Sequence, residues 1–331
     1  MAKIGTIRSN GIIAVLLLVL LLSVNLAAAG TLKVGIANFG EHPVLTAVID
    51  GVKEGMAQNG YPEGSKVSYV ESHTNWDASL VPQMISKLQA DKPNLIVAIT
   101  TPVSQTAKNA LAGTGIPLVF STVTDPVAAK LTPSWDKGDV GISGVSDMQD
   151  MAAVLAFTRK LLPKAKTFGV PYNPGEDNDV ALLKQIKSLA PASGFKVVAV
   201  GVDNTNDIPV RIQSLKGKAD VIYVSGSNLL QSAAPAIAAT AQQINLPTIS
   251  VNLDHVKEGF FMAAFAVDYH QVGVKTGIMA AQILSGTDPA SIAPIRMRYE
   301  DHVPKINTKL VKQLGLSIPA ELKDCDCFVS K

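Results

Sequence analysis

The 331-residue sequence has few cysteines, few aromatic residues and almost no excess of charge of either sign. Aromatic residues make up 5% of the chain, and the formal net charge is +2. Lysines and arginines are scattered, so the composition indicates no nucleic-acid partner and no electrostatic attraction to an anionic membrane surface. The hydrophobic share of 47% and the charged share of 17% are typical of a globular protein with one large or two medium domains.

Motifs of catalysis and of metal or cofactor binding are also missing. The five histidines show no metal-ligand spacing, and the chain has no HExxH, Walker A or GxSxG sequence. The pair Gly113 and Gly115 follows a helical pattern and fits a helix C-cap and turn better than a dinucleotide site. We therefore expect no metal, no cofactor and no catalytic residue, and we expect that the protein is not an enzyme.

Both cysteines, Cys325 and Cys327, lie in the last seven residues. A disulfide across one intervening residue is geometrically awkward, and two thiols do not complete a zinc site. We expect residues 325–331 to be a poorly ordered tail, although an exported protein could oxidise the two thiols within the pair or between chains.

The N-terminus has the pattern of an export signal. Lys3 and Arg8 precede an apolar core at residues 12–22, which is short for a membrane span, and three alanines end at Ala29. The pattern predicts that residues 1–29 are a signal peptide and that the mature protein is periplasmic. No cysteine follows the predicted cleavage site, which argues against a lipoprotein.

From Thr31 onward, strand-like runs alternate with helical patterns of ten or more residues, which predicts parallel sheets with right-handed crossovers. The predicted strands are residues 32–37, 66–71, 94–99, 117–121, 168–171, 195–200, 221–224, 247–251, 260–267 and 295–299. The predicted helices are residues 43–59, 77–90, 102–111, 148–162, 177–189, 207–215, 229–244, 269–284 and 308–314.

The two halves of this pattern are similar to each other. VGIANFGEHPV from Val34 aligns with FGVPYNPGEDNDV from Phe168, and IPLVFS from Ile116 aligns with LPTISV from Leu246. The period is far longer than that of a solenoid repeat. The sequence predicts an α/β fold of two Rossmann-like lobes with parallel sheets and a three-segment hinge. The predicted lobe 1 comprises residues 30–146 and 253–293, and the predicted lobe 2 comprises residues 147–252 and 294–324.

The stretch ITTPVSQT from Ile99 joins a buried strand to a helix. Thr101 fits the N-cap position and Pro102 the first helical position. Because a helix N-terminus presents unpaired N–H groups at the carboxyl edge of the sheet, this turn is suited to bind a carboxylate.

Polar and aromatic side chains follow most of the predicted strands in both lobes, where a ligand would lie in the cleft. Hydroxyl and N–H groups suit a carboxylate, Glu41, Asp125 or Glu176 suits an ammonium group, and an aromatic ring suits a large apolar side chain. The candidate ligand-binding residues are Phe39, Glu41, Thr100, Thr101, Ser121, Thr122, Thr124, Asp125, Tyr172, Glu176, Asn178, Ser225, Ser227, Asn228, Asn252 and Asp254.

Several of these segments resemble one family, the ABC-importer solute-binding proteins that include the tryptophan, tyrosine and phenylalanine binders. The matching segments are EHPVLTAVIDGVKEGM from Glu41, LIVAITTPVSQTAKNA from Leu95, IPLVFSTVTDPVAAKL from Ile116, GVSDM from Gly144, YNPGEDNDVALL from Tyr172 and VDYHQVGVKTGIMAAQIL from Val267. The resemblance covers essentially the whole predicted mature chain.

The resemblance implies a type I periplasmic-binding-protein fold that encloses its ligand by hinge closure, and delivery of the closed form to a membrane permease driven by a separate ATPase. It also implies ligand contacts from Thr101, Ser121, Thr124 and Asp125 in the first lobe and from Glu176 and Asn178 in the second. The chain departs from the family at residues 225–228, where members often have an Asp-Asn-Thr type segment, and at Asn252, where members have Asp.

We therefore expect a monomeric binding protein for a small zwitterion, with a large apolar or aromatic amino acid as the best match. Two alternatives remain at this point. The same fold could present its ligand to a signalling receptor, or the chain could be an exported α/β enzyme that uses Asp125 or Glu41 as a base.

Overall fold

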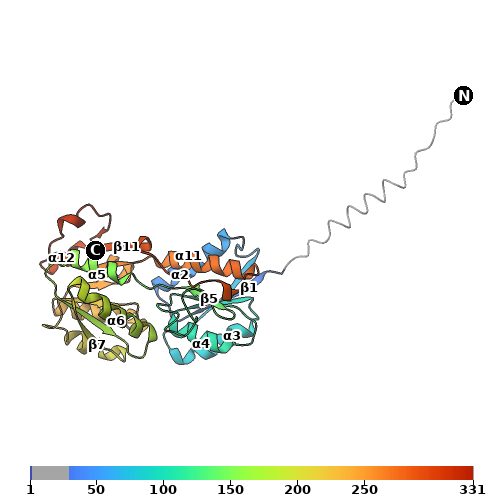
Figure 1. Ribbon diagram of the computed structural model, residues 1–331, viewed down its shortest axis with the longest axis horizontal. Helices are drawn as coiled ribbons and strands as arrows, with labels where there is room; N and C mark the ends of the chain where they lie inside the picture. The colour runs from blue at the N-terminus through green and yellow to red at the C-terminus, as the bar shows by residue number, and fades with distance from the viewer. Residues whose placement is uncertain (2–29, 331) are drawn as a thin grey trace.

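The computed structural model describes Met1 and residues 30–330, so the rest of the predicted signal peptide lies outside the described residues. The described elements form two lobes that lie side by side (Figure 1). Within this part of the chain, no helix combines the length and the apolar character that a membrane crossing requires.

The first lobe contains a five-stranded sheet in the order β2-β1-β3-β4-β5, and all its strand pairs are parallel. Its strands are β1 (Leu32–Asn38), β2 (Val67–His73), β3 (Leu95–Ile99), β4 (Leu118–Ser121) and β5 (Ile142–Val145). Its helices are α2 (Pro43–Gln58), α3 (Val81–Ala90), α4 (Thr101–Leu111) and α11 (Tyr269–Leu284), with short 3₁₀ turns at Ala78–Leu80 and Pro289–Ser291.

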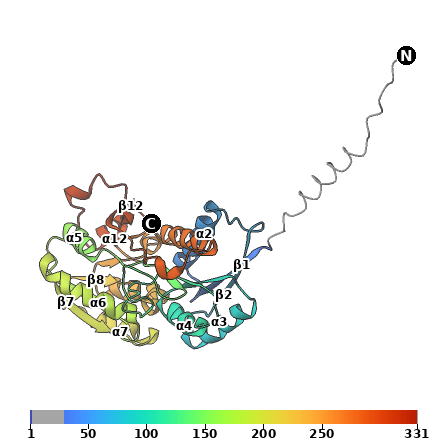
Figure 2. The ribbon, with the colours of Figure 1, turned by 45° about the vertical axis from the view of Figure 1, so that its right-hand side comes forward.

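Helix α11 belongs to this lobe although it comes late in the chain, and Figure 2 shows it in orange beside the blue helix α2. Glycines on both helices allow their backbones to touch: a Cβ atom at Gly51 or Gly55 would overlap the backbone of α11, and one at Gly273 or Gly277 would overlap that of α2. The two helices together cover one face of the sheet with the residues of its apolar core.

The second lobe contains a seven-stranded sheet in the order β12-β11-β10-β9-β8-β6-β7. Its strands are β6 (Thr167–Tyr172), β7 (Lys196–Gly201), β8 (Val221–Val224), β9 (Thr248–Ser250), β10 (Ala263–Val267), β11 (His302–Asn307) and β12 (Phe328–Val329). Its helices are α5 (Met151–Leu161), α6 (Asp177–Leu189), α7 (Ile208–Gln213), α8 (Asn228–Ser232), α9 (Ala234–Gln243), α10 (Leu253–Lys257) and α12 (Thr308–Gln313), with 3₁₀ turns at Ala190–Ser193, Thr205–Asp207, Tyr299–Asp301 and Ala320–Leu322. Only β11 runs antiparallel to its neighbour β10.

The strand orders confirm the internal repeat that the sequence predicted. The order β2-β1-β3-β4-β5 in the first sheet corresponds to β7-β6-β8-β9-β10 in the second. In each lobe the second strand lies on one side of the first strand, and the third strand lies on the other side. The carboxyl ends of the first and third strands therefore border a crevice.

The repeat also corrects one predicted lobe boundary. Strand β10 pairs with β9 and β11, so residues 253–267 lie in the second lobe and not in the first. The chain crosses at Asp268 instead, because β10 completes the second sheet as β5 completes the first. The predicted strand at residues 295–299 is also wrong: there Ile295 makes only an isolated bridge to Val145, and the strand begins at His302.

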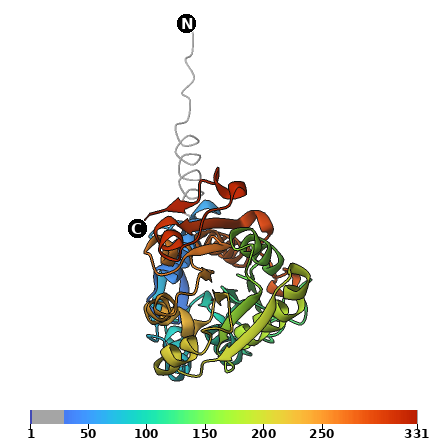
Figure 3. The ribbon, with the colours of Figure 1, turned by 90° about the vertical axis from the view of Figure 1, so that its left-hand side faces the viewer.

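The C-terminal residues do not form the loose tail that the sequence predicted. Cys325 and Cys327 form a disulfide, and Cys327 is fully buried in the core of the second lobe. Strand β12 adds to the edge of the sheet beside β11, where the Ile306 N–H donates to the Cys327 carbonyl. Figure 3 shows this red segment along one edge of the lobe.

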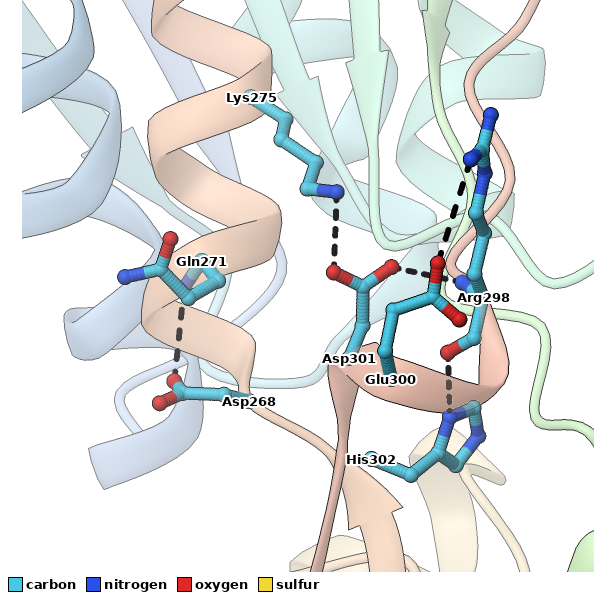
Figure 4. Close-up of polar contacts among 7 residues, drawn as sticks. All are labelled: Asp268, Gln271, Lys275, Arg298, Glu300, Asp301 and His302. Atoms are coloured by element: carbon cyan, nitrogen blue, oxygen red, sulfur yellow. Dashed lines mark hydrogen bonds and ion pairs between the residues drawn. The ribbon is translucent and has the colours of Figure 1, made fainter.

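Three chain crossings join the lobes, at residues 146–150, at Asp268 and at residues 298–301, and they are hydrogen-bonded to one another. The Gln149 side chain accepts from the Val267 N–H, and His302 Nε2 accepts from the Asp150 N–H at 3.0 Å. Figure 4 shows the third crossing: Asp301 pairs with Lys275 of α11 at 3.1 Å and accepts from the Arg298 N–H. These contacts define the hinge between the lobes.

Candidate ligand-binding site

A cavity lies between the two lobes. Its lining residues come from the carboxyl ends of strands in both sheets and from the hinge. They are His42, Val44, Leu45, Trp76, Thr100, Thr101, Thr122, Thr124, Asp147, Asn178, Gly226, Ser227, Asn228, Gln231, Val251, Asn252 and Tyr269.

The lobes touch each other beside this cavity, so the structure is a closed arrangement. Gln105 of α4 donates to the Asp177 carboxylate of α6 at 2.8 Å. The rings of His42 and His255, from opposite lobes, lie 5.2 Å apart in an edge-to-face contact.

The first-lobe wall is built on two strained turns. Thr100 has φ of 83° and Thr122 has φ of 53°, and the Thr100 N–H donates to the Thr122 hydroxyl at 3.1 Å. Left-handed backbone at residues other than glycine costs roughly 1–3 kcal/mol and is concentrated at functional sites. The structure places the N-cap of α4 at Thr100, one residue before the predicted Thr101, and the Thr100 side chain makes no capping bond.

This wall is suited to bind an anion. The first turn of α4 leaves backbone N–H groups without an acceptor in the helix, and the helix dipole adds partial positive charge there. The Thr100 hydroxyl is buried and has no hydrogen-bond partner among the described residues. A ligand carboxylate would satisfy both the hydroxyl and the N–H groups.

The second-lobe wall is different because the protein supplies its own anion. The Glu176 carboxylate accepts from the backbone N–H groups of Asn228 at 2.8 Å and Leu229 at 3.0 Å, at the start of α8. It also accepts from the side-chain amides of Asn228, Asn173 and Asn178.

Glu176 also fixes the orientation of Asn178 at the cavity. Because the Asn178 amide nitrogen donates to Glu176 at 3.2 Å, its carbonyl oxygen is the free end of the amide. This oxygen is buried and has no partner among the described residues. It is an acceptor only, so the ligand group that satisfies it is a hydrogen-bond donor.

Asp147, in the first hinge crossing, lines the cavity and carries a buried carboxyl group; the residue is 7% exposed. It accepts hydrogen bonds from the Tyr269 hydroxyl at 3.2 Å and the Thr124 hydroxyl at 3.3 Å. Burial raises the pKa of Asp147 to about 6, and these two hydrogen bonds oppose the rise. At neutral pH the carboxylate is therefore poised to gain from a cationic partner.

Eight of the sixteen predicted residues line the cavity: Thr100, Thr101, Thr122, Thr124, Asn178, Ser227, Asn228 and Asn252. They come from both lobes, as predicted from the strand ends. Their contact with a ligand remains a prediction.

The structure places the other four first-lobe candidates outside the cavity lining. Phe39 packs edge-on against Trp76, and Ser121 is hydrogen-bonded to Thr276. Glu41 is exposed near His73, and Asp125 caps the backbone N–H groups of Val127 and Ala128, as turn-forming aspartates do.

The remaining second-lobe candidates also have protein partners. Tyr172 packs against the core, Ser225 donates to Asp179, and Asp254 pairs with Lys257. Glu176 acts on the cavity only through Asn178 and α8. In these cases the side chain serves local folding, which sequence alone does not distinguish from ligand binding.

Sequence reasoning missed nine lining residues: His42, Val44, Leu45, Trp76, Asp147, Gly226, Gln231, Val251 and Tyr269. Asp147 and Tyr269 lie within the matching segments GVSDM and VDYHQ, so the resemblance contained a signal for them. Trp76 lies in the loop just after β2, whose carboxyl end is at the same edge of the sheet, but the predicted candidates included no residue after this strand.

The two lobes, the three-segment hinge and the enclosed cavity define a two-lobed ligand-binding protein of the type I periplasmic binding class. Residues 33–325 match the sequence model of a family described as ABC transporter substrate binding protein. The chain belongs to this family, which confirms the predicted resemblance and fold. Members of the family are transport proteins that bind substrates.

Three relatives are informative. The chain is 32% identical over 284 residues to a tyrosine-binding protein of Clostridioides difficile (strain R20291), covering 86% of this chain and 81% of the relative. A Streptococcus pneumoniae domain crystallised with L-Trp is 28% identical with a TM-score of 0.85, covering 91% of this chain and all of that one. A ligand-free, open Clostridium difficile substrate-binding protein with adhesive properties is 32% identical with a TM-score of 0.70, at the same coverage.

The two TM-scores support the closed arrangement of the lobes. Both structures have similar identity and equal coverage, yet the open one superposes less well.

Proposed function

We propose that the protein captures an amino acid with an aromatic side chain in the interlobe cavity and delivers it to an ABC permease. The observation that carries this proposal is a pair of buried polar atoms that have no partner among the described residues, the Thr100 hydroxyl and the Asn178 carbonyl oxygen, on two residues that line the cavity from opposite lobes. Relatives that bind tyrosine and L-Trp support the aromatic class.

The two walls suggest how a zwitterion lies in the cavity. Its carboxylate accepts from the N–H groups of α4 and from Thr100. Its ammonium group donates to the Asn178 oxygen and pairs with the Asp147 carboxylate. Each contact of this kind contributes roughly 1.5–3 kcal/mol.

Such a ligand bridges the lobes and thereby favours the closed state over the open one. No bond is made or broken. The closed form is what the permease, driven by its separate ATPase, recognises. The protein acts as an exported, periplasmic monomer after removal of residues 1–29, without a lipid anchor.

Calorimetry and thermal unfolding of the mature chain from Gly30 test the proposal, after unfolding and refolding to remove any carried ligand. Phenylalanine, tyrosine and tryptophan are expected to bind, and at a hundred times the dissociation constant each adds about 2.7 kcal/mol to the free energy of unfolding. Phenylalaninamide and 3-phenylpropionate, which lack the carboxylate or the ammonium group, are expected to bind at least tenfold more weakly. A protein that binds sugars or purines and no amino acid contradicts the proposal.

A further inference from the structure

We infer that Trp76 is the residue that makes the cavity selective for an aromatic side chain. The inference rests on the proposed function and deepens it. Trp76 lines the cavity from the loop between β2 and α3, which follows the carboxyl end of β2 beside β1.

The backbone that holds Trp76 is strained. Asn75 has φ of 51° and Trp76 has φ of 69°, a left-handed conformation that is unfavourable for a bulky side chain. The turn is tied to the strand β1 side of the lobe, where the Phe39 carbonyl accepts from the Trp76 N–H at 2.9 Å and from the Thr74 hydroxyl at 2.8 Å. Glycine would make the same turn without strain, so the position retains a large side chain at a cost in stability.

The indole ring is held rigidly by its neighbours. It lies against Gly40, where a Cβ atom would approach the indole nitrogen to 2.5 Å. The rings of Phe39 and His42 lie at 5.5 Å and 6.0 Å, both in edge-to-face orientation. Neither contact stacks a ring parallel to the indole, and the inference assigns that contact to the ligand ring.

Trp76 lies where the ligand side chain is expected, because the polar walls bind the carboxylate and the ammonium group. The groups assigned to the carboxylate and the ammonium come from α4, the hinge and the second lobe. Val44 and Leu45, in the first turn of α2, line the cavity together with Trp76 and make an apolar portion of its first-lobe wall. The ligand side chain is therefore directed to this portion, where stacking on an indole favours a ring over an aliphatic chain of similar size.

The chain offers a matched spectroscopic control because it has two tryptophans. The Arg296 guanidinium lies over the Trp135 ring, with its Cζ atom 3.7 Å from the ring centroid, and Trp135 does not line the cavity. In Trp135→Phe, which keeps Trp76, saturating phenylalanine is expected to change the tryptophan emission. In Trp76→Phe, which keeps Trp135, the emission is expected to stay constant while calorimetry still detects binding. Constant emission in Trp135→Phe during binding overturns the inference.

Selectivity supplies the second test. Trp76→Leu keeps an apolar side chain and is expected to weaken phenylalanine binding about tenfold, while leucine binding changes less than threefold. Gly40→Ala displaces the indole without removing any ligand-contacting group, and it is expected to shift the same ratio in the same direction. Circular dichroism and thermal unfolding check that both variants fold.

The outcomes separate the inference from the proposed function. Wild-type protein that binds no amino acid contradicts the proposed function. Wild-type protein that binds aromatic amino acids, together with an unchanged phenylalanine-to-leucine affinity ratio in Trp76→Leu, overturns the inference alone.

Discussion

The two lobes share one topology but differ at the helix that follows their third strand. In the first lobe, the N-terminus of α4 carries no side-chain cap and opens into the cavity. In the second lobe, the N-terminus of α8 is filled by the Glu176 carboxylate. The same structural position thus has uncapped N–H groups in one lobe and is occupied by a protein carboxylate in the other.

This difference gives the cavity a direction. A symmetric pair of free helix N-termini would accept a carboxylate at either end. With Glu176 in place, the second lobe presents the Asn178 oxygen, which accepts hydrogen bonds, and the hinge adds the Asp147 carboxylate. In the proposed complex, a zwitterion therefore has one favourable orientation, with its carboxylate on the first lobe.

Removal of the internal anion is the change expected to have the largest effect. Glu176→Ala loses two charge-assisted bonds to backbone N–H groups and leaves the start of α8 and the Asn178 amide without their partner. The free energy of unfolding is expected to fall by about 3 kcal/mol or more, and ligand affinity to fall with it. Urea denaturation and calorimetry measure the two effects.

Glu41 provides the matched control because the repeat aligns it with this region of the second lobe, and its side chain is 84% exposed. Glu41→Ala is expected to change the free energy of unfolding by less than about 0.5 kcal/mol. Equal effects of the two substitutions would show that Glu176 has no special role at α8.

Asp147→Asn separates affinity from stability. Loss of the carboxylate is expected to weaken binding of phenylalanine by about 10-fold to 100-fold, since a charged hydrogen bond of roughly 1.5–3 kcal/mol is lost. At a pH above 7 and without ligand, the free energy of unfolding of Asp147→Asn is expected to equal or exceed that of the wild type. The reason is that burial of the charged carboxylate is unfavourable and raises the pKa of Asp147 to about 6. Calorimetry and urea denaturation at pH 8 test both signs.

Asp125→Asn is the comparison for this substitution, because Asp125 caps a turn outside the cavity lining. It is expected to leave affinity within about threefold. A larger loss than in Asp147→Asn would move the ammonium site to Asp125, one of the three carboxylates that the sequence offered for it.

The histidine contact between the lobes predicts a pH dependence of closure. Burial and, to a smaller extent, the nearby His42 lower the pKa of His255 from 6.5 to about 4, and Asp254 opposes this. In the open state the two rings separate, so the pKa rises by the part of the shift that His42 contributes, while Phe260 and Phe261 of the same lobe continue to cover the ring. Above pH 6.5 both states are neutral at this position, so closure is independent of its titration.

As the pH falls from 6.5 towards 4, the open state takes up the proton more readily than the closed state, so the closed state loses stability. Affinity for phenylalanine is therefore expected to fall with pH in this window, by less than about tenfold per pH unit. His255→Phe is expected to reduce this slope, and the part that remains reports protonation of Asp147. A slope that is identical in wild type and His255→Phe argues against the contact.

The sequence was informative where position follows from topology. Alternating strands and helices and the internal repeat predicted two lobes, and parallel strands bring their carboxyl ends together, so half of the candidate residues line the cavity. The roles of Glu176 and Asp125 were not predictable, because a carboxylate beside a helix start or turn has the same sequence pattern whether it binds a ligand or the backbone. Trp76 was missed although it lies just after the carboxyl end of β2, because no candidate was expected in the loop after that strand.

The smallest expected effect concerns the direct contact between the lobes. Gln105 of α4 donates to Asp177 of α6 in the closed arrangement, an exposed bond that opening breaks. Gln105→Ala is therefore expected to weaken ligand affinity by about twofold to fivefold, the range of a solvent-exposed hydrogen bond, and to leave unfolding nearly unchanged. Gln58→Ala is the control, because the Gln58 bond to Glu54 lies within α2 and does not change on opening. Calorimetry on both variants measures the difference. If the two give equal affinities, closure depends on the ligand contacts of the two unlike walls and not on contacts at the rim.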